Sequence, residues 1–214
     1  MIVLVGIAHL DLEGYQRTKK LLDTLKPTAI GIETTPEDFK QHIELGNAMN
    51  DPDRFRHAYE SMRRTFPRAD EDTLKQWLNT LQYHTRAAND HAHRYGTPII
   101  HGVKEEDFTT PYAAKDKAPQ KDKETLEDFL AQTPQEARED IRKEYARSTY
   151  PVKDDPNLTS FYQRCDETAE HALRNQEGTI VYLGGLDHIY GDYHNLHDRL
   201  QDTHVTRMKL DEAD

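Results

Sequence analysis

Two stretches near opposite ends of the chain repeat one pattern, an apolar run followed by Gly-x-x-His. The first, VLVGIAH, spans residues 3–9, and the second, VYLGGLDH, spans residues 181–188. An apolar run bounded by glycine is typical of a strand that is buried on both faces of a parallel sheet. Ligand sites of open α/β sheets lie beyond the carboxyl ends of such strands. We therefore expect His9 and His188 at an edge of the sheet where chemistry is usually done.

A third apolar run, TAIGIE over residues 28–33, ends on the acidic Glu33. Two imidazoles and a carboxylate at one sheet edge would suit a divalent metal ion such as Mn, Co or Zn. A lone Gly-x-x-His is weak evidence, because most histidines at strand ends bond to nearby backbone, but the coincidence of three strand ends favours a shared site. Gly6 and Gly185 lack a Cβ, so they allow either close approach of an ion, a substrate or a neighbouring backbone, or a tight strand exit.

The composition limits the class of protein. The 214 residues suit one domain of ordinary size, or one with a large insertion. The net charge of -11 would repel nucleic acid and anionic membranes. Cys165 is the only cysteine, which excludes an internal disulfide and a cysteine-based zinc cluster and fits a reducing cytoplasm. Because we find neither a signal-peptide pattern nor an apolar stretch that could span a bilayer, we expect a soluble cytoplasmic protein.

Periodicity predicts the order of the elements. The first 33 residues indicate a strand, a helix that ends before Pro27, and a second strand, which implies parallel pairing. A charged helical insertion follows over about 36–95, with helix starts at Thr35-Pro36 and Asp51-Pro52. A short strand is expected over 97–102.

Residues 111–123 have almost nothing to bury and indicate a mobile loop. Helices are expected after the capping box Thr133–Glu136 and after Asp155-Pro156. The second Gly-x-x-His strand, a helix over 190–200 and an edge strand over 203–210 complete the chain. We therefore predict a single α/β domain over 1–214, with a central mostly parallel sheet flanked by helices, the large charged helical insertion, and an edge strand at the C-terminus. An insertion folded over the edge with the two histidines would shape a substrate cleft.

The motifs resemble those of a known family. They are VGIAH at 5–9, GIE at 31–33 after Lys26-Pro27, GLDH at 185–188, and Gln163-Arg164, where the family commonly shows Glu-Arg on the helix before the last strand. On these residues the chain resembles the TraB/PrgY/GumN family, which includes the TIKI proteases and belongs to a wider group with the erythromycin-esterase-like and ChaN-like proteins.

The resemblance implies a metal-dependent catalytic centre at His9, His188 and Glu33, with Arg164 matching a family arginine. The chain departs from the family at residues 100–105, where relatives often carry an Asp-Arg pair before a threonine. Glu105 is a candidate to take over the role of that pair. The alternative is that no residue of this chain takes it over. Many relatives carry a membrane anchor, whereas we find no apolar stretch in these residues that would serve as one, so a membrane-bound substrate is not assumed.

Other candidate residues have simpler interpretations. We interpret the pairs His194/His197 and His84/His91 as parts of solvated helix faces rather than metal sites. Asp11 is expected to cap the first helix, with orientation of His9 as the alternative. The same two interpretations, a helix cap or a partner of the nearby histidine, apply to Asp187. Cys165 is expected to be a small core residue rather than a nucleophile.

The sequence thus predicts a divalent-metal-dependent hydrolase that acts on a peptide or a small molecule. Glu33 would complete the ligand set or take a proton from water, and Arg164 would stabilise an oxyanion. One alternative is a non-catalytic protein that binds a small ligand or cofactor. Another is a metal-independent, esterase-like hydrolase in which a histidine is the general base and Glu33 orients it. The oligomeric state is left open.

Overall fold

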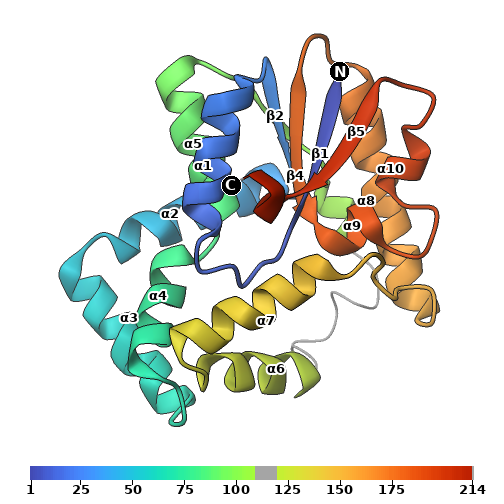
Figure 1. Cartoon of the computed structure of the whole chain (residues 1–214). Coiled ribbons are helices and arrows are strands. Elements are labelled where there is room, and N and C mark those ends of the chain that lie inside the picture. Colours follow the sequence, from blue (N-terminus) through green and yellow to red (C-terminus); the bar gives the residue numbers. More distant parts are fainter. Residues whose placement is uncertain (109–119, 214) are drawn as a thin grey trace.

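A computed structural model of the chain describes residues 1–108 and 120–213 (Figure 1). Its centre is a five-stranded sheet in the order β3-β2-β4-β1-β5, and every neighbouring pair is parallel. The strands are β1 (Ile2–Ile7), β2 (Ala29–Ile32), β3 (Ile99–His101), β4 (Ile180–Gly185) and β5 (Val205–Lys209). The predicted α/β class, the parallel sheet and the C-terminal edge strand are confirmed.

Helices flank the sheet and extend beyond it. They are α1 (Gly14–Leu25), α2 (Pro36–Met49), α3 (Pro52–Thr65), α4 (Glu71–Thr80), α5 (Tyr83–Tyr95), α6 (Gln120–Leu130), α7 (Pro134–Ala146), α8 (Pro156–Arg174), α9 (Leu186–Tyr190) and α10 (Leu196–Arg199), with the short 3-10 turns η1 (Glu105–Phe108) and η2 (Leu210–Ala213). Within the described residues, no helix has both the length and the apolar character needed to cross a membrane.

The predicted helix starts are confirmed at the level of single hydrogen bonds. The side chains of Thr35 and Thr133 each accept a backbone N–H from the third residue after them, and Asp51 and Asp155 accept N–H groups from the first turn of α3 and α8. A proline follows each of these caps, where its missing N–H costs no helical bond. A capping side chain followed by proline is a local signal, so it predicts the first residue of a helix without knowledge of the tertiary packing.

The two Gly-x-x-His strands are direct neighbours in the sheet. β1 pairs with β4 from Ile2 opposite Ile180 to Ile7 opposite Gly185, and both strands are buried throughout. β2 lies on the other side of β4. The carboxyl ends of β1, β4 and β2 therefore meet at one edge of the sheet.

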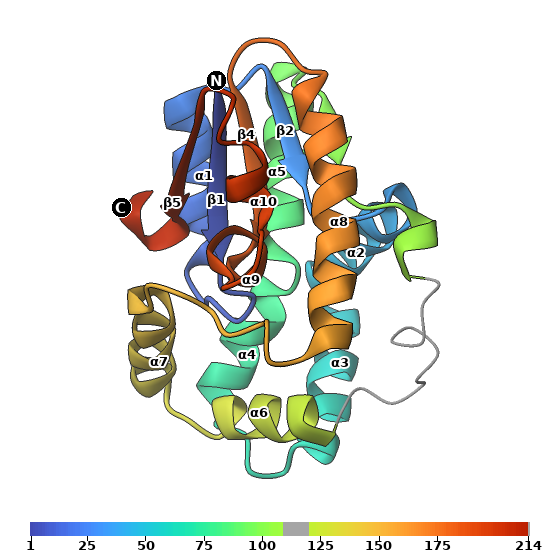
Figure 2. The ribbon, with the colours of Figure 1, turned by 90° about the vertical axis from the view of Figure 1, so that its right-hand side faces the viewer.

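Two apolar cores cover the two faces of the sheet. Val5 and Val181 pack with side chains of α1 and α5 on one face, whereas Leu4 and Tyr182 pack with α8 and α10 on the other. The predicted insertion 36–95 therefore divides into two parts. α5 belongs to the helical layer that covers one face of the sheet, whereas α2, α3 and α4 extend beyond that layer (Figure 1). Figure 2 shows α6 and α7 crossing beyond the carboxyl ends of the strands.

Two of the sequence expectations need correction. The helix expected over 190–200 is wrong: α9 ends where the Gly191 N–H bonds the Asp187 carbonyl, and Asn195 caps the separate α10. Of the loop expected over 111–123, residues 111–119 lie outside the described part of the chain. Residues 120–123 form the first turn of α6, in a segment of Gln, Lys and Glu that favours helix.

Candidate functional site at the carboxyl edge of the sheet

His188 is a buried imidazole held between two carboxylates. It lies on α9, directly after β4, and only 3% of its side chain is exposed. Its Nδ1 lies 2.6 Å from Oδ1 of the buried Asp166 on α8. Its Nε2 lies 2.9 Å from Oε1 of Glu33. A buried histidine can have a carboxylate at each nitrogen only where several elements of the fold converge. The position of His188 is therefore fixed by tertiary packing.

Glu33 follows β2 and faces the same point from the neighbouring strand. Its Oε2 accepts the Gly185 N–H at 2.6 Å, which fixes the carboxylate against the end of β4. Oε1 of Glu33 lies 2.9 Å from Nε2 of His188, so the two side chains form an ion pair. The Glu33 carboxylate is thus held between the Gly185 N–H and the His188 ring.

His9 completes the group predicted from the sequence. It is exposed in the turn after β1. A Cβ built on Gly185 would lie 3.3 Å from Nε2 of His9, 3.5 Å from Oε2 of Glu33 and 3.8 Å from Cδ2 of His188. The structure therefore brings the three residues together around Gly185. Gly6 differs, because a Cβ there would meet Leu186 at 2.8 Å, so its absent side chain serves packing rather than the site.

Charge pairing dominates the titration of this group. Burial alone would lower the pKa of His188, but the charges of Glu33 and Asp166 raise it well above its usual value. Burial would raise the pKa of Glu33, yet the charge of His188, with His9 and the Gly185 N–H, lowers it to about 2. Burial raises the pKa of Asp166, and its bonds from His188 and Tyr193 oppose this shift. In the metal-free protein the pair is thus an imidazolium and a carboxylate at neutral pH.

Two tyrosines fix the turn that carries His9. Tyr83 on α5 donates to the Ala8 carbonyl at 2.9 Å, and Tyr145 on α7 accepts the Ala8 N–H at 3.1 Å. Tyr145 donates in turn to Asp11 at 3.2 Å. Asp11 is buried and pairs with Arg17 at 2.8 Å, so the expectation that it caps α1 is wrong. The cap position is Glu13, whose backbone N–H donates to Oδ1 of Asp11 at 2.9 Å, while Oδ2 of Asp11 accepts from Arg17 and Tyr145.

Sequence reasoning missed three residues around His188. Asp166 is the first, and Tyr193 donates to its Oδ2 at 2.7 Å. Tyr162 packs edge-on against His188 with ring centroids 4.4 Å apart, and it donates to Asp187 at 3.1 Å. One signal was available: Asp166 lies beside Cys165 on an apolar helix face, where a buried carboxylate requires a partner.

His84 also belongs to this region. It is buried, and its ring lies edge-on to His9 with centroids 5.9 Å apart, so the expectation of a solvated face for His84 and His91 is wrong. Burial, together with the charge of His9, lowers the pKa of His84 to about 3. His194 precedes α10, which carries His197, so these two do not share a helix face.

The remaining candidates are placed as follows. Arg164 donates to Ser160 on its own helix at 2.9 Å, whereas two other residues of α8, Tyr162 and Asp166, contact His188. Glu105 begins η1. Cys165 is buried, and burial raises the pKa of its thiol, as expected for a core residue rather than a nucleophile.

The donor atoms at this edge suit a divalent ion, and their arrangement is incomplete. Two imidazoles and a carboxylate match Mn, Co or Zn, and Nε2 of His188 faces the Glu33 carboxylate at 2.9 Å. Within residues 1–108 and 120–213, however, no three His, Cys, Asp or Glu side chains already stand as a group that could hold a metal ion. Asp166 supplies the partner that orients a ligating histidine through its other nitrogen.

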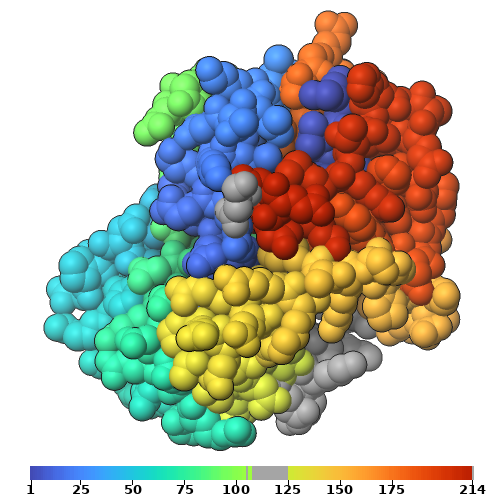
Figure 3. Space-filling view, in the orientation of Figure 1, coloured from blue at the N-terminus to red at the C-terminus, as the bar shows by residue number. Residues whose placement is uncertain are grey.

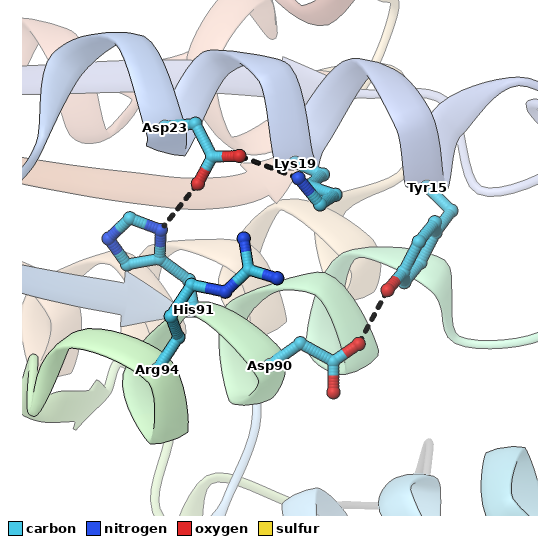
Figure 4. A pocket seen from close by; sticks show the side chains of 6 residues that line it. All are labelled: Tyr15, Lys19, Asp23, Asp90, His91 and Arg94. Atoms are coloured by element: carbon cyan, nitrogen blue, oxygen red, sulfur yellow. Dashed lines mark hydrogen bonds and ion pairs between the residues drawn. The ribbon is translucent and has the colours of Figure 1, made fainter.

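A second polar cluster lies between α1 and α5 and lines a pocket of about 150 Å³. Figure 4 shows its six side chains, which are Tyr15, Lys19, Asp23, Asp90, His91 and Arg94. Tyr15 donates to Asp90 at 2.5 Å, and Asp23 pairs with Lys19 at 2.6 Å. Both carboxylates thus have partners from within the cluster, and the contacts join the two helices.

The carboxyl edge is the stronger candidate, because its side chains come together from the ends of β1, β2 and β4 and from α8, and they hold His188 between two carboxylates. The resemblance to the TraB family rests on the motifs alone. Comparison of the chain with family models, with curated proteins and with solved structures finds no significant match.

Proposed function

We propose that the chain is a divalent-metal-dependent hydrolase and that a peptide bond is its favoured target. The observation that carries the proposal is the setting of His188: Nδ1 is held by buried Asp166, and Nε2 faces the Glu33 carboxylate at 2.9 Å. A histidine held in this way is oriented like a metal ligand whose tautomer is fixed by a carboxylate. The proposed ligands are His188, Glu33 and His9.

The protein residues would divide the work as follows. Asp166 retains the proton on Nδ1 of His188, so that Nε2 is the nitrogen that binds the ion. The Gly185 N–H holds Glu33, which either ligates the ion or accepts a proton from the attacking water. The bound ion would supply Lewis acidity and lower the pKa of that water. Since His9 is exposed in a turn, its side chain is the one that moves to complete the ligand set.

Metal uptake tests the ligand assignment. We expect calorimetric titration with Mn, Co and Zn to detect binding to the wild type, and His9→Ala and His188→Gln to abolish it. His188→Gln is preferred to alanine because it fills the buried space. His194→Ala is the matched control, since His194 is exposed and precedes α10. Undiminished uptake by both site variants would rule the site out.

Hydrolysis tests the function itself. The metal-loaded wild type is screened against a peptide library and a panel of esters, with chelator-treated enzyme in parallel. Glu33→Gln separates the two roles of Glu33. If Glu33 is a general base, the variant still binds metal while the rate falls by about 10²–10⁴-fold. If Glu33 is a ligand, metal affinity falls with the rate, because an amide oxygen is a poorer donor to a divalent ion.

One alternative enzyme has support from the same region. The described residues contain no preformed group of three metal ligands, which favours a metal-independent hydrolase in which a histidine is the base. Hydrolysis that survives chelation would select that alternative. Metal uptake without cleavage of any peptide or ester would instead select a non-catalytic binding protein.

A further inference from the structure

A pocket beside the candidate site is lined by an acidic side chain that the proposed function does not use. The pocket has a volume of about 430 Å³ and lies between the turn after β1 and helices α6 and α7. Leu10, the neighbour of His9, forms one wall, and Glu144 of α7 forms another. This places a carboxyl group in the same pocket as Leu10, the residue that follows His9 in the turn.

The position of Glu144 is fixed by its neighbours along α7. Tyr145, the next residue, is buried and bonds the Ala8 N–H and Asp11 in the His9 turn. Lys209 at the end of β5 donates to the carbonyls of Tyr145 and Arg147, which holds the C-terminal turn of α7 to the sheet. In Figure 3 the surface of α7 adjoins both the N-terminal and the C-terminal segments of the sheet layer. Glu144 is therefore part of a rigid wall.

The carboxyl group of Glu144 is available for chemistry. In the described part of the chain, no hydrogen bond or ion pair engages its side-chain oxygens, and the residue is only partly exposed. Burial raises its pKa, and Asp187 and Asp11 act in the same direction, whereas Arg147 and His9 oppose them. Asp140 in the same pocket differs, because Lys143 and Gln132 bind it at 2.7 and 2.5 Å.

We propose that Glu144 is a catalytic residue that donates a proton to the leaving group, and that the pocket between Leu10 and Glu144 holds the leaving-group side of the substrate. This inference rests on the proposed hydrolase function. It places the two carboxyl groups on opposite sides of the scissile bond, Glu33 at the sheet edge and Glu144 on α7.

The proposed step balances as follows. The water oxygen bonds the scissile carbonyl carbon while the water loses a proton to Glu33. The carbon–nitrogen bond then breaks, and its electron pair on the leaving nitrogen takes the proton of the Glu144 carboxyl group. The products are a carboxylic acid and an amine, with Glu33 protonated and Glu144 ionised. Proton exchange with solvent restores both groups. Separation of the acid and base roles between two carboxyl groups of different environment is a general route to hydrolysis near neutral pH.

Dependence on the leaving group tests this role. A peptide cleaved by the wild type is compared with the 4-nitrophenyl ester of the same acyl segment, whose leaving group needs no proton. We expect Glu144→Gln to lower kcat/KM for the peptide by about 10²-fold and to leave the ester within about 3-fold. Glu139→Gln is the matched control, since Glu139 is exposed on the same helix and does not line the pocket, and we expect it to change the rate for neither substrate.

The outcomes separate the two proposals. Equal loss on both substrates, or no loss on the peptide, would overturn the role of Glu144 and leave the hydrolase intact. Failure of the wild type to cleave any peptide or ester would overturn the hydrolase and this inference with it. Metal uptake by Glu144→Gln is measured in parallel and is expected to match the wild type, because Glu144 is not a proposed ligand. A thermal melt of each variant confirms that it is folded.

Discussion

Among the described residues, the buried histidines His91 and His188 each lie beside an aspartate, and their pKa values shift in opposite directions. At the carboxyl edge of the sheet, the pKa of His188 rises well above its usual value. In the cluster between α1 and α5, burial lowers the pKa of His91 despite its contact with Asp23. Each side chain is 3% exposed, so burial alone does not explain the difference.

The carboxylates around the two histidines explain why their pKa values shift in opposite directions. His188 lies between Asp166 at 2.6 Å and Glu33 at 2.9 Å, and Asp166 itself is buried. Asp23 lies 3.4 Å from His91, is 30% exposed and is shared with Lys19. Because solvent and a competing cation weaken the second contact, desolvation dominates there. An Asp–His contact therefore raises the histidine pKa only where the carboxylate is bonded mainly to the histidine and is shielded from water.

The largest expected effect is on stability at the carboxyl edge. Asp166→Ala leaves the imidazolium of His188 with one partner in a buried site, and we expect it to lower the free energy of unfolding by about 3–5 kcal/mol. Asp23→Ala is the matched change in the other cluster and should cost less than about 1 kcal/mol, since that pair is partly solvated. Urea denaturation of both variants measures the difference. Equal losses of stability in the two variants would show that Asp166 is no more important to its histidine than Asp23 is.

A methyl group at Gly185 should affect function more than folding. In Gly185→Ala the new Cβ would stand among His9, Glu33 and His188 at contacts of 3.3 to 3.8 Å, which the neighbours can accommodate. We expect kcat/KM to fall by about 10²-fold, equivalent to about 2.7 kcal/mol, with a smaller loss of stability. Gly6→Ala should do the reverse, because its Cβ would overlap Leu186 in the core. Kinetics and thermal melts of both variants decide whether the two glycines differ.

The two histidines should also give opposite pH dependence in chelator-treated protein. The folded-state pKa of His188 is raised, so its stabilising contribution is full below its unfolded pKa of about 6.5 and is lost as pH rises through the folded value. The folded-state pKa of His91 is lowered, so its contribution is present above about 6.5 and is lost as pH falls through the folded value.

Denaturation between pH 5 and 9 tests this sign reversal. The stability difference between the wild type and His188→Gln should shrink toward high pH. The corresponding difference for His91→Gln should shrink toward low pH. The same trend for both histidines would show that the carboxylates at the sheet edge do not control His188.

The smallest expected effect concerns the contact between Tyr15 and Asp90. Tyr15→Phe removes one partly exposed hydrogen bond between α1 and α5, so we expect a loss of about 1 kcal/mol or less and unchanged hydrolysis. Burial, with the bond to Asp90, raises the pKa of Tyr15 to about 12. Its contribution is therefore retained near neutrality and lost above about pH 10, where the unfolded phenol ionises. A change in hydrolysis would assign this cluster a role beyond packing.

The sequence by itself determined those features that depend on neighbouring residues. Continuous apolar runs indicated buried parallel strands, and a side chain before proline indicated the starts of α2 and α3. Since parallel strands share one carboxyl edge, His9, Glu33 and His188 were expected together, and the structure places them around Gly185. The separate α9 and α10 were missed, because the break depends on a bridge between Tyr150 and Gly191 that joins distant segments.

Only the tertiary structure decided which groups surround these residues. Asp166, His84 and Glu144 come from three helices whose sequences give helical faces but not the angles at which they pack on the sheet. Gly6 and Gly185 have the same motif, yet one contacts core side chains and the other faces the site. Periodicity, capping and strand burial depend on residues that are close together in the sequence. The pKa of a buried histidine depends instead on charged groups that the fold brings from far along the chain.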